Sequence, residues 1–181
     1  MLFREQGFEG VTIEQLAKAA DVSAPTIYAL FQSKRGILKA LMDEALPTEQ
    51  REALVDAVNK EQSPKERIAL AAKIARQMYD AERAQMDIFQ GAALLAPEFK
   101  ELEKEREDRR YQRQAESMQM MVRDKALAKG LSLSQAQDIL WAFTGRDMYR
   151  MLVMERGWSS DDYEEWLTQT LVKALLEKGK E

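Results

Sequence analysis

The stretch "TIEQLAKAADVSAPTIYALFQSK", residues 12–34, holds two short amphipathic helices that are separated by a tight turn. In both helices the apolar residues recur three or four apart, which puts them on one side of the helix. They are Ile13, Leu16, Ala17 and Ala20 in the first helix and Ile27, Leu30 and Phe31 in the second. The two stripes can face each other across the turn at residues 21–23, so the stretch predicts a helix-turn-helix unit.

Capping signals define where these helices begin. "TIEQ" at residues 12–15 has Thr at the cap and Gln three residues later, the pattern of a capping box. Ser23 precedes the second helix, and Pro25 in its first turn loses no hydrogen bond because first-turn amides lack partners in the helix. Asp21 lies where the chain must reverse, and Asp tolerates the left-handed conformation better than most residues.

The second helix has the dimensions and the surface that DNA recognition requires. In helix-turn-helix proteins the second helix enters the major groove, which is about 12 Å wide. Bulky outward residues would hold the helix away from the bases, so the small Pro25 and Ala29 suit this face. We therefore expect residues 1–46 to form a small domain that binds double-stranded DNA.

The segment "LFREQGFEGVTIEQLAKAADVSAPTIYALFQSKRGILKALM" resembles the DNA-binding part of the TetR family of bacterial transcription regulators. The shared pattern comprises a Phe-Gly-Phe-like loop, the Thr before the second helix, the Ile/Leu-Ala spacing, Val-Ser, Thr-Ile-Tyr and Phe-x-Ser-Lys. The resemblance implies DNA-binding roles, with phosphate contacts at both ends of the unit and base contacts at the start of its second helix. The residues concerned are Thr12, Ser23, Ala24, Pro25, Thr26, Tyr28 and Lys34.

Each role has a structural alternative. Thr12 can serve as a helix cap, Tyr28 can flank the domain core, and Lys34 can be an ordinary surface residue. The sequence also departs from the family at Ala29 and Leu30, where aromatic or polar residues are common, and this favours apolar contacts with thymine methyl groups.

The first domain lacks the basic character typical of nucleic-acid binding. Residues 1–46 contain five basic and six acidic residues, a net charge of −1. The helix that should end near Gln6 retains only its last turns, "MLFREQ". We expect a segment before Met1 to complete this helix and to add Lys or Arg.

The overall composition predicts an all-α protein and argues against an enzyme. The chain of 181 residues has no Cys and no His, which removes the usual nucleophile–base pairs and most transition-metal ligands. No phosphate-binding Gly-rich loop, signal peptide or 18-residue apolar run is present. We therefore expect no catalytic residues, metal or cofactor, no membrane association, and a location in the bacterial cytoplasm, on the nucleoid when DNA is bound.

Cap signals divide the chain into helices, with "SPKE" at residues 63–66, "SLSQ" at 132–135 and "WSSDDY" at 158–163 as further boundaries. No stretch alternates at period two, so we expect no strands. The expected helices cover residues 13–20, 24–31, 34–46, 49–60, 64–82, 85–95, 98–128, 133–156 and 160–178. Residues 1–46 form the DNA-binding domain, and residues 47–181 form a larger helical domain for ligand binding and dimerisation, as the resemblance implies.

The last two expected helices carry more apolar surface than one domain core requires. The 133–156 helix is apolar around most of its circumference, so it should be covered on two sides, by the core and by a second subunit. The alternative is that both helices belong to the core of a monomer. The expected dimer interface comprises Met151, Leu152, Tyr163, Trp166, Leu167, Thr170, Leu171 and Leu175.

Met and aromatic side chains between residues 64 and 154 are candidates for the ligand site, because Met adapts to irregular apolar ligands. Plain core packing is the alternative for each of them. The candidates are Met78, Phe89, Met118, Trp141, Phe143 and Met148. Arg106 or Arg113 could bind an acidic ligand if either turned inward from the charged 98–113 stretch, which is otherwise a solvated face.

Together these features predict a ligand-responsive transcription regulator, a repressor that binds a palindromic operator as a homodimer and is released by a small molecule. The alternative is a helical ligand-binding or scaffold protein with little affinity for DNA.

Overall fold

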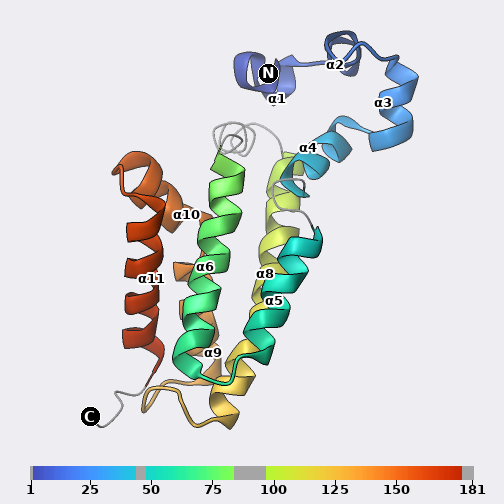
Figure 1. Ribbon diagram of the computed structural model, residues 1–181. Helices are drawn as coiled ribbons and strands as arrows, with labels where there is room; N and C mark the ends of the chain where they lie inside the picture. The colour runs from blue at the N-terminus through green and yellow to red at the C-terminus, as the bar shows by residue number, and fades with distance from the viewer. Residues whose placement is uncertain (1, 44–47, 84–96, 177–181) are drawn as a thin grey trace. The chain divides into compact units, whose positions relative to one another are not determined.

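The computed structural model describes residues 2–43, 48–83 and 97–176, and within these ranges the protein is all-helical (Figure 1). The only extended pairing in this part of the chain is an isolated antiparallel bridge between Leu127 and Leu176. The helices are α1 (Leu2–Gly10), α2 (Ile13–Ala19), α3 (Ala24–Phe31), α4 (Lys34–Asp43), α5 (Thr48–Lys60), α6 (Pro64–Glu82), α8 (Pro97–Arg123), α9 (Leu133–Phe143), α10 (Arg146–Tyr149), the π-helix η2 (Arg150–Glu155) and α11 (Ser160–Leu175). The expected fold class is confirmed.

The chain divides into two compact units. Unit 1 comprises Met1–Pro47 and Ala81–Glu107, and unit 2 comprises Thr48–Asp80 and Asp108–Glu181. The division falls within α6 and α8, so each of these helices contributes to both units.

Unit 1 is built around α1–α4 and the first turns of α8. Gly7 interrupts α1 with φ 72° and ψ 166°, a conformation that glycine adopts without strain, and this agrees with the expected helix end near Gln6. The buried residues of this core are Phe3, Phe8, Val11, Leu38 and Leu102. Leu102 of α8 therefore completes an apolar core that is otherwise supplied by the first 41 residues.

The capping signals act as the sequence predicts. Gln15 donates its backbone N–H to Thr12 Oγ1, and Thr12 donates its own N–H to Gln15 Oε1, so the capping box is complete. Ser132 and Gln135 form the same reciprocal pair before α9. Ser33 caps α4 by accepting the Gly36 N–H at 3.1 Å.

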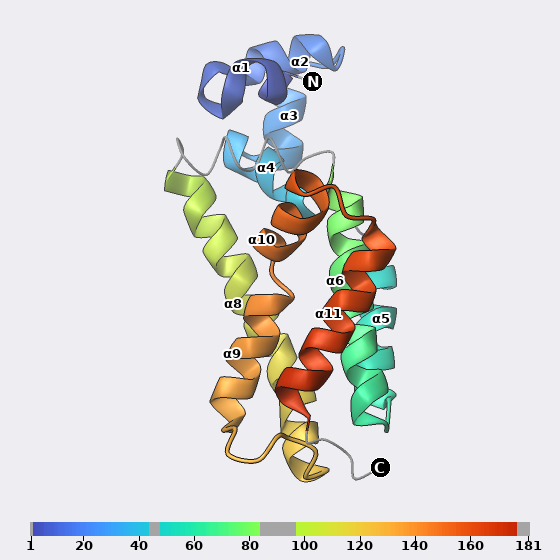
Figure 2. The same cartoon turned by 90° about the vertical axis from the view of Figure 1, so that its left-hand side faces the viewer.

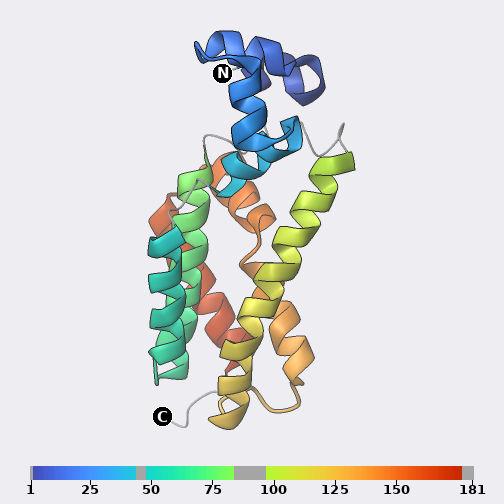
Figure 3. The ribbon, with the colours of Figure 1, turned by 90° about the vertical axis from the view of Figure 1, so that its right-hand side faces the viewer.

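Unit 2 is a set of packed helices whose buried residues are mostly apolar. Figure 3 shows α5 and α6 side by side, and Figure 2 shows α9 next to α11. The largest fully buried side chains of this unit are Arg67, Ile68, Met118, Met121, Leu140, Tyr149, Tyr163, Leu167 and Leu171. Arg67 is held by two hydrogen bonds to the Glu61 carbonyl and by an ion pair with Asp124, so its buried charge is compensated.

The expected helix at 133–156 is not continuous. It breaks at Thr144 and Gly145, and Gly145 is extended with φ −78° and ψ 158°. Side chains from elsewhere in the unit satisfy the carbonyls that the break exposes: Arg110 donates to the Trp141 oxygen and Tyr79 to the Thr144 oxygen. The apolar residues that the sequence placed around one long helix are therefore distributed over α9, α10 and η2.

Two other expected helices differ from the structure. The 98–128 helix ends at Arg123, because Lys125 turns the chain with φ 54° and Ala128 then donates its N–H to the Leu175 oxygen. The expected helix at 85–95 lies outside the described residues.

Candidate nucleic-acid interface

The helix α3 is fixed by packing against α2. Ile13, Ala17 and Ile27 form a buried cluster, and Leu16, Ala24, Phe31 and Ile37 pack around it. Asp21 makes the turn between the helices with φ 54°, the left-handed conformation that the sequence led us to expect there. This packing leaves the opposite side of α3 in solvent.

The cap residues of the unit have defined local partners. Thr12 is exposed and engaged in its capping box. Ser23 Oγ accepts the Thr26 N–H at 3.2 Å and lies 2.7 Å from Thr26 Oγ1. The structural alternative for Thr12 is therefore realised, and a phosphate contact from this residue stays a prediction.

Two residues of α3 differ in exposure from what the sequence predicts. Ala24 is half-buried against the α2–α3 cluster, so it lies at the margin of the exposed face and not at its centre. Leu30, which the apolar spacing placed in the core, is 69% exposed. The spacing failed because Ile27 and Phe31 together cover the contact with α2, and Leu30 lies to one side of both.

The remaining face of α3 is exposed. Pro25 and Ala29 are in solvent, and Tyr28 is 48% exposed and does not flank the core as a buried side chain. No charged residue occurs in α3.

Lys34 is tethered within unit 1. Its Nζ donates to the Val11 carbonyl oxygen at 3.1 Å, lies 3.9 Å from Glu9 and lies 4.6 Å from the centre of the Phe8 ring. An ammonium group has three donors, so one contact with a carbonyl still leaves capacity for phosphate. In the structure Lys34 fixes α4 to the α1–α2 connection, a role that no sequence pattern indicated.

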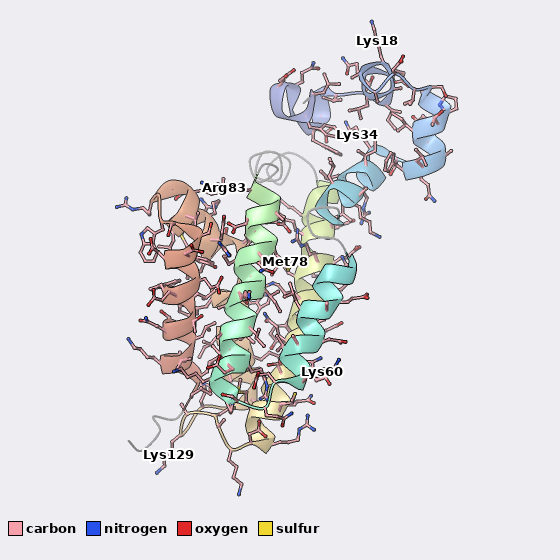
Figure 4. The ribbon with its side chains drawn as sticks, viewed as in Figure 1. Lys18, Lys34, Lys60, Met78, Arg83 and Lys129 are labelled. Atoms are coloured by element: carbon pink, nitrogen blue, oxygen red, sulfur yellow. The ribbon has the colours of Figure 1, made fainter. Side chains whose placement is uncertain are left out.

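Few other cations are available near α2 and α3. Arg35 pairs with Glu101 and Glu105 of α8 at 3.2 and 3.4 Å. Lys18 is exposed, and Figure 4 shows its side chain extending away from α2. Lys18 is therefore the best-placed cation on α2 for a phosphate contact.

The candidate ligand residues lie on several helices of unit 2. Met118 is 1% exposed, and Met78, Trp141, Phe143 and Met148 are half-buried. Trp141 packs edge-on against Tyr111, whereas Phe143 packs on Trp166, so these two aromatic rings have different neighbours. Phe89 lies outside the described residues.

A polar network inside unit 2 was not anticipated. Thr144 Oγ1 accepts hydrogen bonds from Arg110 and Gln114, both at 2.9 Å, and the Arg110 guanidinium lies 5.4 Å from the Trp141 ring centre. The neighbouring Tyr163 hydroxyl is buried without a hydrogen-bond partner, and burial raises the pKa of this phenol. The sequence could not indicate the network, because Arg110 and Gln114 lie 34 and 30 residues before Thr144 in the chain.

Half of the expected dimer interface lies inside the subunit. Tyr163, Leu167, Leu171 and Leu175 are fully buried in the single chain, so they have no surface left for a second copy. The hydrophobic stripe of α11 is the side that faces α9 and the core. Met151 is 37% exposed, and Leu152, Trp166 and Thr170 are half-buried, so only these four retain exposed surface.

Within the described residues, no three acidic side chains are placed to hold a metal ion, and no helix is long and apolar enough to cross a membrane. The fold is a helix-turn-helix unit with an exposed second helix, α3, joined to a larger helical unit.

Residues 1–41 match the bacterial regulatory proteins of the tetR family, so the expected resemblance is confirmed on the segment that carried it. Members of this family are DNA-binding regulators and not enzymes, as the composition led us to expect. No curated protein matches the chain.

Solved structures with the same fold cover nearly the whole chain. The FadR regulator of Bacillus subtilis, in complex with stearoyl-CoA, has a TM-score of 0.75 at 16% identity over 94% of this chain and 92% of its own. A putative transcriptional regulator of Saccharomonospora viridis, in complex with choline, has a TM-score of 0.68 at 20% identity over 98% and 93%. NalD of Pseudomonas aeruginosa, the secondary repressor of the MexAB-OprM multidrug efflux pump, has a TM-score of 0.69 at 22% identity over 97% and 90%.

Proposed function

We propose that this protein is a cytoplasmic transcription repressor that binds a palindromic operator as a homodimer and is released by a small molecule. The observation that carries the proposal is the exposed face of α3, held by the α2–α3 core within the segment that matches the tetR family. In helix-turn-helix dimers two such helices enter major grooves about 34 Å apart, which is one turn of DNA.

The test is a footprint of the full chain on DNA next to its own gene, at a stated salt concentration, because phosphate contacts make affinity strongly salt-dependent. Protection of two half-sites about one helical turn apart supports the proposal. Absence of a protected site there and in a genome-wide selection of bound fragments contradicts it.

We place the effector site in unit 2, where the described candidate side chains lie, and two solved structures with this fold are complexes with stearoyl-CoA and with choline. Met118, Trp141 and the other half-buried or buried candidates supply apolar contacts, and the Arg110–Thr144 network supplies polar groups nearby. A ligand releases DNA only if it binds the two conformations of the protein with different affinity.

The helix α8 offers a route for this coupling. Its first turns carry Leu102 into the core of unit 1 and its later turns carry Arg110 in unit 2. A ligand that shifts the Arg110 end of α8 would therefore act on the helices that position α3.

A contact between α2 and DNA phosphate is tested best by replacing Lys18. Replacing Lys34 would be less informative, because its contact with the Val11 carbonyl also stabilises the fold. We expect Lys18→Ala to weaken binding to all DNA sequences by a similar factor and to reduce the salt slope by about 2, which is about 1 for each subunit of the dimer. Fluorescence anisotropy over a salt series measures both quantities. Lys129→Ala, which removes an exposed lysine from unit 2, should change neither; an unchanged slope for Lys18→Ala would remove α2 from the interface.

The homodimer is tested at Met151, the most exposed of the four candidates that retain surface. Met151→Glu should bury a charge in the interface and shift the protein toward monomers, because an unpaired buried charge costs several kcal/mol. Sedimentation velocity measures the change. Val122→Glu, at a 45% exposed apolar residue of α8, is the matched control. A Met151→Glu dimer as stable as the parent would place the interface elsewhere.

The alternative, a helical ligand-binding protein with little affinity for DNA, is favoured by the charge of the first domain. Residues 1–46 carry a net charge of −1, and Lys34 and Arg35 are engaged with groups of the protein itself. The footprint described above separates the two functions.

A further inference from the structure

The exposed face of α3 lacks the side chains that read most base pairs. Bidentate readout uses Arg or Lys for guanine and Asn or Gln for adenine, and acidic residues read cytosine. The α3 sequence, "APTIYALF", contains none of these residue types. Only two hydroxyl groups, those of Thr26 and Tyr28, are left within the helix for hydrogen bonding to bases.

The Thr26 hydroxyl is already engaged in the cap. It lies 2.7 Å from Ser23 Oγ, which also accepts the Thr26 backbone N–H at 3.2 Å. This arrangement holds the hydroxyl toward the start of the helix, so Thr26 is better suited to contact DNA through its methyl group than through a new hydrogen bond.

The rest of the exposed surface at α3 is mostly apolar. Of the seven large hydrophobic side chains that are exposed in the described ranges, three lie close together in sequence: Val22 at 43%, Tyr28 at 48% and Leu30 at 69%. Because residues four apart lie on the same side of a helix, Pro25 and Ala29 form one row and Thr26 and Leu30 form the next. These two rows lie outside the buried Ile27 and Phe31.

We infer that this apolar face reads thymine methyl groups, so that each operator half-site is specified by A·T pairs whose methyls contact Pro25, Ala29 and Leu30. The C5-methyl of thymine is the apolar feature that distinguishes base pairs in the major groove. The inference rests on the proposed function and adds the chemistry by which the operator is recognised. It also gives a reason for a leucine left 69% exposed in the free protein.

The experiment replaces thymine by uracil, which pairs identically and lacks only this methyl. The full chain is used to select its operator from a randomised duplex library, and each thymine of the selected half-sites is then replaced by deoxyuridine. A buried methyl group is worth roughly a fourfold change in affinity. One methyl lost in each half-site should therefore weaken binding about sixteenfold, whereas uracil in the flanking DNA should have no effect.

Two further measurements assign the contact to α3. Leu30→Ala, at a surface position whose truncation leaves the core intact, should reduce the uracil effect at one thymine of each half-site, and Leu133→Ala, at a 37% exposed residue of α9, should leave it unchanged. In an operator with C·G at that position, 5-methylcytosine should recover part of the lost affinity because it restores the methyl.

The outcomes are distinguishable. Equal affinity for thymine and uracil operators would overturn the inference and leave the regulator intact. A selected operator whose half-sites are G·C-rich would do the same. Failure to select any duplex would contradict the proposed function itself, and the inference with it.

Discussion

Replacing Gly36 by Ala is expected to lower the free energy of unfolding of unit 1 by about 3 kcal/mol and to abolish operator binding. A Cβ at Gly36 would lie 1.8 Å from the Phe31 carbonyl oxygen, which belongs to the backbone and cannot move as a side chain would. Alanine favours a helix over glycine by only about 1 kcal/mol, so the clash outweighs the gain. The end of α3 must shift away from α4, and the exposed face of α3 shifts with it.

Gly10→Ala is the matched control, because a Cβ there meets only the Gln6 Cβ at 3.6 Å, an ordinary contact. Urea unfolding followed by circular dichroism, together with an operator gel shift, measures both effects. If the Gly36 variant unfolds at the same urea concentration as the Gly10 variant, the close approach of α3 and α4 is not a requirement of this fold.

Replacing Leu102 by Ala is expected to lower the free energy of unfolding of unit 1 by about 3 kcal/mol, the usual cost of removing a buried leucine. Leu102 is 5% exposed and packs with Phe3, Phe8, Val11 and Leu38. Because Leu102 ties the start of α8 to the DNA-binding helices, the variant should also respond less to an effector. Urea unfolding measures the first result, and release of the operator by effector measures the second.

The variant Arg35→Ala is the control that separates apolar packing from charge in the contact of α8 with the first helices. Arg35 joins α4 to the same helix through ion pairs with Glu101 and Glu105, but these groups are partly exposed, and such pairs contribute less than about 1 kcal/mol. If Leu102→Ala costs no more than Arg35→Ala, the contact between α8 and the first helices depends on charge and not on the apolar core.

The local rules of helix formation were readable from the sequence. The capping boxes at Thr12 and Ser132, the Ser23 cap and the left-handed Asp21 all involve groups within three residues of each other, or a single residue. Their energetics are set by neighbours in the chain, so the residue types alone are informative. The resemblance of the first 41 residues then gave the class of protein.

Most departures from expectation involve contacts between segments that are not neighbours in the chain. The break at Thr144 depends on Tyr79 and Arg110, the tether of Lys34 on Val11, and the exposure of Leu30 on how Ile27 and Phe31 fill the contact with α2. Helical spacing tells which residues share a side of a helix, but it does not tell how wide the buried side is. The apolar stripe of α11 is a second example: helical spacing identified the stripe, but it did not tell that these residues are buried within the single subunit.

By itself the sequence determined an all-helical chain, the places where most helices begin, and the helix-turn-helix segment, because these follow from short-range hydrogen bonding and periodicity. Only the tertiary structure decided which apolar side chains stay in solvent on α3, where the long helices break, and that Leu102 of α8 belongs with the first helices. Those features depend on packing and on hydrogen bonds between residues far apart in the chain, which no local pattern records.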